Sequence, residues 1–237
     1  MTPRTALWAE IAEAVATDIA TGAYRPGDKL PSEAALATRF GVNRHTVRRA
    51  LAHLSAGNLV RTRQGAGAFV AHRPTEYPLG RRTRFSENLR AAGRMPRREM
   101  LALETRAATG HEAAKLNLAT GARVHMVLGL GRADGVPLSL NQSVFPAALL
   151  PNLPRDLSET KSITAALRRG GIFDYTRAHT RLSAEIATAS QAGQLDLRIG
   201  AALLRTEGLN VDPTGRPVEY GTTWFAGDRV TLTVGGE

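Results

Sequence analysis

Basic side chains gather in one short stretch of the sequence, directly after Asn43. The stretch contains Arg44, His45, Thr46, Arg48 and Arg49. Val47, Leu51 and Leu54 recur there at helical spacing, so a helix that packs them inward projects most of the basic side chains from its other face. Asn43 is a good N-cap, which places the helix start at Arg44. Such a basic face fits the major groove of DNA.

The charge of the chain is unevenly distributed. The net charge is +10 and the sequence pI is near 11.0. No Asp or Glu occurs between Ala34 and Thr75, whereas this region holds Arg39, Arg44, Arg48, Arg49, Arg61, Arg63 and Arg73. This imbalance indicates an anionic partner, and its coincidence with two helices and a tight turn favours nucleic-acid phosphates over a membrane surface.

The elements around this stretch predict a winged helix-turn-helix domain over residues 1–73. A four-residue repeat of apolar side chains predicts a first helix over 5–21, and Ser32 is the expected N-cap of a short second helix that ends at Gly41. After the third helix, two short strands flank a turn at residues 64–67. Gly65 and Gly67 fit a hairpin that needs positive φ; a dinucleotide-binding loop would need a preceding strand, a third glycine and a following helix.

The rest of the chain predicts a second domain of α+β class. Residues 74–80 contain two prolines and a glycine and are predicted to be a semi-rigid linker. Residues 81–237 alternate strand-like runs with shorter helical segments, at 111–118, 147–153 and from Ser162. Turn signals at 133–135 and 213–215 separate strands at hairpin spacing, which predicts a mainly antiparallel sheet.

Catalytic and metal-binding patterns are missing from the sequence. It has no cysteine, and its six histidines are scattered without a metal-ligand spacing. His125 is expected in the core and His45 on the DNA-facing surface. We therefore expect neither an enzyme nor a metal or cofactor. No apolar run is long enough for a membrane span and acidic residues occur near the N-terminus, so we expect a cytoplasmic protein without a membrane partner.

Residues 30–70 resemble the DNA-binding domain of GntR-type bacterial repressors. The second half, with FSENLRAAGRMP and VDPTGRPVEYGTTWFAGDRV, resembles the effector-binding UTRA domain of the HutC subfamily, whose fold is similar to chorismate lyase. Within that subfamily, RTRFSENL, GRADGVPLSL and FDYTRAHTRLSA look most like regulators of phosphonate uptake and degradation. The resemblance implies a homodimeric repressor that binds operator DNA and a small anionic effector.

The resemblance also implies DNA-binding residues. Carried over position by position, the family's DNA contacts fall on Arg44, His45, Thr46, Arg48 and Gly65. Together with the caps, the remaining basic residues and the second wing glycine, the expected DNA-binding set also includes Ser32, Asn43, Arg49, Arg63 and Gly67. Some family members place an Arg directly after the Glu of the PSE motif, where this chain has Ala34, so that contact is predicted to be missing.

For the effector, the resemblance places a phosphate-holding serine at Ser86 and a carboxylate at Glu219. The Arg-x-Arg strand of sugar-phosphate sensors falls here on Gly129 and Gly131, and their aromatic hydroxyl falls on Phe225, which disfavours a sugar phosphate. Charge for an anion must then come from other side chains. The candidates, with one aromatic neighbour, are Arg84, Arg132, Arg177, Arg181 and Tyr175.

Two alternatives stay open. The chain could regulate another catabolic pathway, of the histidine/urocanate or amino-sugar type, or it could bind DNA without any small-molecule effector. Phosphate contacts alone would serve the second role equally well. The size and mixed sheet of the second domain favour a ligand cavity.

Overall fold

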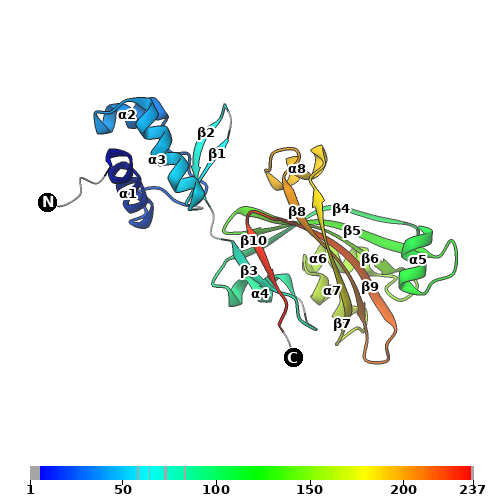
Figure 1. Cartoon of the computed structure of the whole chain (residues 1–237). Helices are drawn as coiled ribbons and strands as arrows, with labels where there is room; N and C mark the ends of the chain where they lie inside the picture. Colours follow the sequence, from blue (N-terminus) through cyan, green and yellow to red (C-terminus); the bar gives the residue numbers. More distant parts are fainter. Residues whose placement is uncertain (1–5, 58, 64, 72–73, 83, 236–237) are drawn as a thin grey trace. The chain divides into compact units, whose positions relative to one another are not determined.

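The structure is a computed structural model that describes residues 6–57, 59–63, 65–71, 74–82 and 84–235 (Figure 1). The side chain of Arg63 lies outside the described part. The chain forms two compact units, Met1–Arg73 and Pro74–Glu237. None of the helices in the described ranges is long and apolar enough to cross a membrane.

The first unit consists of three helices and a two-stranded hairpin. Its elements are α1 (Leu7–Ala20), α2 (Glu33–Phe40), α3 (Arg44–Ala56), β1 (Val60–Arg63) and β2 (Gly67–Val70). The predicted caps are confirmed: Ser32 Oγ accepts from the backbone N–H of Ala35, and Asn43 Oδ1 accepts from that of Thr46. Gly41 ends α2 in the left-handed conformation that glycine adopts without strain.

One apolar core holds this unit together. Val47 and Ala50 of α3 are fully buried, and they pack with Leu36 of α2 and Val15 of α1. β1 and β2 pair antiparallel, with Val60 opposite Val70. The arrangement confirms the predicted winged helix-turn-helix.

The second unit is built on a six-stranded antiparallel sheet with the order β4-β5-β6-β9-β8-β7. These strands are β4 (Pro96–Ala107), β5 (Arg123–Ala133), β6 (Val136–Pro146), β7 (Thr176–Ile186), β8 (Ala202–Val211) and β9 (Pro217–Ala226). The α+β class with a mainly antiparallel sheet is thus confirmed. The hairpin turn at Asp134–Gly135 joins β5 to β6, with positive φ at both residues.

Helices cover both faces of this sheet (Figure 1). Leu116 of α5 (Gly110–Leu116) and Leu195 of α8 (Ala189–Leu195) pack on one face. The other face carries α4 (Phe85–Ala91), α6 (Leu153–Thr160) and α7 (Ile163–Arg169). The helix predicted at 147–153 is wrong, because residues 147–152 form turns and α6 starts at Leu153, with Pro154 in its first turn.

The predicted linker is largely part of the second unit. Residues 75–78 form strand β3 (Thr75–Pro78), which pairs in parallel with β10 (Val230–Thr233). Thr75 and Tyr77 are buried while Glu76 and Pro78 are exposed. This alternation is typical of a strand with one buried face. The two prolines do not prevent the strand, because Pro78 occupies its last position and Pro74 lies outside it.

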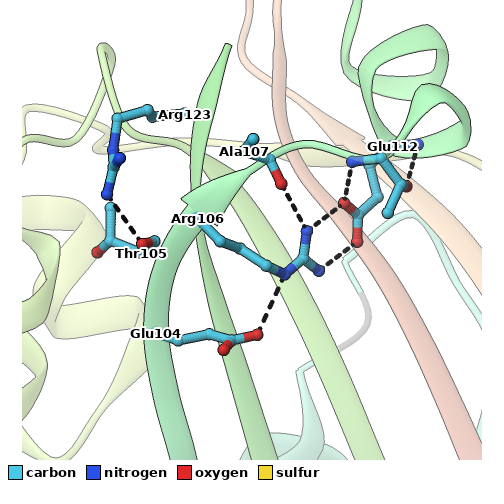
Figure 2. A network of polar contacts seen from close by, with 7 residues as sticks. Glu104, Thr105, Arg106, Ala107, Glu112 and Arg123 are labelled. Atoms are coloured by element: carbon cyan, nitrogen blue, oxygen red, sulfur yellow. Dashed lines mark hydrogen bonds and ion pairs between the residues drawn. The ribbon is translucent and has the colours of Figure 1, made fainter. Parts of the chain in front are cut away.

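An ion-pair network joins the end of β4 to the start of α5 (Figure 2). Arg106 donates two hydrogen bonds of 2.7 Å to the carboxylate of Glu112 and one of 3.1 Å to Glu104. Glu112 also completes the capping box of α5 with Thr109. The bonds from Arg106 lower the pKa of Glu112, and the carboxylate in turn raises the pKa of Arg106.

The turn between β8 and β9 is held by the carboxylate of Asp212. Its Oδ1 accepts from the Thr214 hydroxyl at 2.6 Å and from the backbone N–H groups of Thr214 and Arg216. These bonds, the Thr214 hydroxyl first, lower the Asp212 pKa to about 2. The turn fixes the register in which Asn210 lies opposite Glu219.

We expect Asp212→Asn to lower the melting temperature at neutral pH. Because the folded-state pKa is depressed, the charged form stabilises the protein above the unfolded-state pKa of about 4, and this stabilisation is lost as pH falls toward about 2. Thermal melts of both proteins across this pH range should converge at the acid end. A difference that stays constant with pH would contradict the assignment to the charge.

Candidate functional site: a basic helix and a polar cavity

The exposed face of α3 is the first candidate site. Arg44 and His45 are exposed in its first turn, and the Thr46 hydroxyl donates to Asn43 Oδ1 at 2.9 Å. Arg44 makes no hydrogen bond or ion pair with a residue in the described ranges. Its guanidinium is therefore available for phosphate or base oxygens.

The other arginines of α3 have partners within the first unit. Arg48 donates to both carboxylate oxygens of Glu33 at 3.1 and 2.8 Å, which lowers the Glu33 pKa and raises that of Arg48. The Arg49 guanidinium lies 4.8 Å from the ring centre of Trp8 on α1. Sequence reasoning treated both as DNA-facing, but spacing on one helix could not reveal these contacts with α2 and α1.

The wing glycines have the backbone conformations that their turn requires. Gly65 has φ +76° and no atom that would meet a Cβ within 4 Å, and Gly67 has φ +105°. A Cβ at Gly67 would lie 3.2 Å from the Lys29 side chain. The expected contact from Arg63 lies outside the described side chains.

A polar cavity of about 430 Å³ in the second unit is the second candidate site. It lies on the sheet face that carries α4 and α7. Its charged lining residues are Arg84, Glu87, Arg90, Arg98, Lys161, Arg177 and Glu219, so five cations face two carboxylates. Such a lining suits an anionic ligand.

The structure brings most of the predicted effector residues to this cavity. Those that line it are Arg84, Ser86, Tyr175, Arg177 and Glu219. The Arg84 guanidinium lies 5.5 Å from the Tyr175 ring centre, and burial raises the pKa of Tyr175. Arg84 Nε is buried without a hydrogen-bond partner among the residues described.

Arg132 and Arg181 do not reach this cavity. Arg132 donates to the carbonyl of Gly135 at 3.1 Å and faces Glu99. Arg181 is exposed on β7 opposite Glu207, which lies on the other face of the sheet. A bulge between Arg177 and His179 shifts the strand by one residue, so Arg177 and Arg181 point to opposite faces despite their even spacing.

Sequence reasoning missed one arginine that lines the cavity, Arg98. It is on β4 directly opposite Gly131, and its guanidinium stacks 4.8 Å from the ring centre of Phe85. Protein atoms crowd the guanidinium, although the side chain is accessible from the cavity. The resulting desolvation lowers the pKa of Arg98, while the charges of Tyr77 and Glu219 act in the opposite direction and raise it.

Gly131 makes this placement possible. A Cβ at Gly131 would lie 2.5 Å from Phe85 Cζ and 2.6 Å from Ser139 Oγ, so the Phe85 ring occupies space that any other residue would fill. At the positions expected to carry arginines in sugar-phosphate sensors, the glycines of this chain leave room for neighbouring side chains. Gly129 does the same for Asn141, whose Oδ1 would lie 3.0 Å from an added Cβ.

The strand that carries Arg98 gave a weak sequence signal. A bulge between Met100 and Ala102 interrupts the alternation of β4, and four of its first five residues are exposed. The charged Pro96–Glu99 segment therefore lacks the apolar pattern that identified the other strands. The usable signal was that this segment lies beside Gly129 and Gly131, and this neighbourhood is known only once β4 is paired with β5.

Three neutral polar side chains complete the cavity floor. Ser143 Oγ donates to Glu219 Oε1 at 2.6 Å, and Asn210 Nδ2 donates to Glu219 Oε2 at 2.7 Å. Asn210 Oδ1 accepts from Arg177 Nε at 2.7 Å. Asn141 is 5% exposed, and its Oδ1 has no hydrogen-bond partner among the described residues.

Comparison with known proteins gives a family match for each of the two units. Residues 7–70 match the profile of bacterial regulatory proteins of the gntR family, and residues 91–231 match the UTRA domain. The chain is 38% identical to the probable transcriptional regulator PhnF of Escherichia coli K12 over 213 residues, 89% of this chain and 88% of that protein.

Two further relatives cover nearly the whole length. The HTH-type transcriptional repressor NagR of Bacillus subtilis is 28% identical over 226 residues, 95% of this chain and 93% of that protein. The crystal structure of PhnF from Mycobacterium smegmatis superposes with a TM-score of 0.67 at 27% identity, covering 98% of this chain and 99% of that one. With a DNA-reading unit, an effector unit and full-length relatives of this kind, the chain belongs to the GntR family of transcriptional regulators, in the HutC subfamily that carries a UTRA domain.

Proposed function

We propose that this regulator is a homodimeric repressor whose operator binding is controlled by a small phosphonate- or phosphate-like metabolite. The observation that carries the proposal is the cationic cavity of the second unit, where Arg98, Arg84 and Arg177 line one space of about 430 Å³. Guanidinium groups bind phosphate-like oxygens through paired hydrogen bonds. The relative NagR is named a repressor, which supports the negative sign of regulation.

A phosphonate-related role is supported by two observations. The segments RTRFSENL and FDYTRAHTRLSA resemble phosphonate regulators, and the 38% identity to PhnF extends over most of both chains. Gly129, Gly131 and Phe225 replace the groups expected for a sugar-phosphate ligand, which weighs against an amino-sugar phosphate. Histidine- or urocanate-type effectors carry a single carboxylate, which needs fewer cations than the five that line this cavity.

We expect strand β3 to transmit ligand binding from the cavity to the DNA-binding unit. This strand starts directly after Pro74, the first residue of the second unit, and contributes Tyr77 to the cavity wall. Tyr77 packs 5.0 Å from the ring centre of Phe225, which also lines the cavity. A ligand that displaces this wall biases the segment joining the two units, and hence the spacing of two recognition helices on a pseudo-palindromic operator.

Replacement of Arg44 by alanine tests the DNA-reading role of α3. If Arg44 contacts a base edge, Arg44→Ala should cost about 1 to 3 kcal/mol of operator affinity and relax preference at one position per half-site. Binding to an operator library measures both effects, with the exposed Arg155 of α6 replaced as a control. An equal loss on all sequences would assign Arg44 to a phosphate instead.

Ligand-dependent melting tests the cavity. A ligand at 100 times its Kd should stabilise the protein by about 2.7 kcal/mol, seen as a higher melting temperature. Arg98→Gln should weaken binding of a phosphonate about 10- to 100-fold, because charge-assisted hydrogen bonds are lost. Arg132→Gln, outside the cavity, should have no effect. A flat response of the wild-type protein to phosphonates, phosphate and phosphate esters would favour the ligand-free alternative.

Operator binding with and without ligand tests the coupling. At saturating effector, operator affinity should fall about 5- to 150-fold, the usual range for coupled sites. Fluorescence anisotropy with a labelled operator measures this directly. Unchanged affinity under conditions where melting shows full occupancy would contradict the regulatory part of the proposal.

A further inference from the structure

Glu219 is an unusual group in a cavity whose charged lining residues are mainly cations. The other lining carboxylate, Glu87, is paired with Arg84 at 3.1 Å. Glu219 instead accepts from the neutral Ser143 hydroxyl and Asn210 amide, and it makes no ion pair within the described ranges. The carboxylate is therefore held in place by neutral donors, and Arg98 interacts with its charge without forming an ion pair among the described residues.

The nearby guanidinium of Arg177 is kept apart from this carboxylate by Asn210. The Asn210 amide accepts from Arg177 with one end and donates to Glu219 with the other. Arg177 lies flat against the backbone of Gly208, where a Cβ would overlap its Nη1 at 1.7 Å. The fold thus holds a cation and an anion at separate places instead of letting them pair.

An unsatisfied acceptor, Asn141 Oδ1, lies on the same face of the sheet. Asn141 precedes Ser143 by two residues on β6, lines the cavity, and is 5% exposed, with Oδ1 lacking a donor among the described residues. Buried acceptors without a donor are costly, so a hydrogen-bond donor supplied at this end of the cavity would be favourable. A primary ammonium group offers three donors and a positive charge.

We propose that the effector is a zwitterion that carries a phosphonate- or phosphate-type group and a primary ammonium group. The anionic group binds at Arg98 and its cationic neighbours, and the ammonium group binds at Glu219. This inference rests on the proposed function, since it assigns the chemical class of the ligand in the same cavity. A ligand with both charges complements the separated charges of the site, whereas a plain anion leaves Glu219 as a repulsive group.

Two nearly isosteric ligands test the inference on the full-length wild-type protein. The ligand 2-aminoethylphosphonate carries the ammonium group, and propylphosphonate has a methyl group in its place. Isothermal titration calorimetry should give about 10-fold or tighter binding of the aminated ligand, because hydrogen bonds to a charged partner are gained.

A variant then locates the preference. Glu219→Gln should reduce affinity for 2-aminoethylphosphonate to about the level of propylphosphonate and leave propylphosphonate binding equal or tighter. Glu87→Gln is the matched control, because that carboxylate is already paired, and it should retain the preference. Melting without ligand verifies folding; if Glu219→Gln does not fold, the wild-type comparison decides.

The outcomes separate the inference from the proposed function. Equal binding of the two phosphonates, or a preference that survives Glu219→Gln, overturns the ammonium site and leaves an anionic effector in place. Binding of inorganic phosphate without either phosphonate has the same meaning. If neither phosphonates nor phosphate bind, the anionic effector itself is wrong and the inference falls with it.

Discussion

The cavity depends on the antiparallel register of β6, β9 and β8. This register places Asn210 directly opposite Glu219 and Ser143 opposite Gly221, two residues along β9 and therefore on the same face. Because alternate residues share a face, a shift of one residue on any of these strands would move its polar side chain to the opposite face. The turn held by Asp212 and the bulge after Asn210 fix that register, so the charges of the site follow from backbone pairing.

Glycines shape the site by making room for other side chains. Gly131 admits the Phe85 ring, and that ring supports the Arg98 guanidinium from the neighbouring strand. Gly208 gives Arg177 a place against the backbone of β8. Both arginines are thereby positioned by contacts with groups far away in sequence, and Asn210 keeps Arg177 apart from Glu219.

The fold of the first unit, the winged helix-turn-helix, was largely predictable because the features that determine it are local in sequence. Apolar spacing, the caps at Ser32 and Asn43, and Gly41 at the end of α2 all act within a few residues, and the structure has each of them. The cavity was predictable in part: family resemblance led to Glu219 and Ser86. Arg98 was missed since a bulge hides the pattern of β4, and Arg181 was misplaced since a bulge reverses the face of β7.

The sequence by itself determined the family, the two-unit organisation and the basic face of α3, since these depend on composition and short-range periodicity. Tertiary structure alone decided that Arg48 pairs with Glu33, that residues 75–78 are a strand, and that Arg98 stacks on Phe85. The physical reason is that such contacts depend on strand register and helix packing between distant segments. Neither composition nor local spacing encodes which distant groups meet.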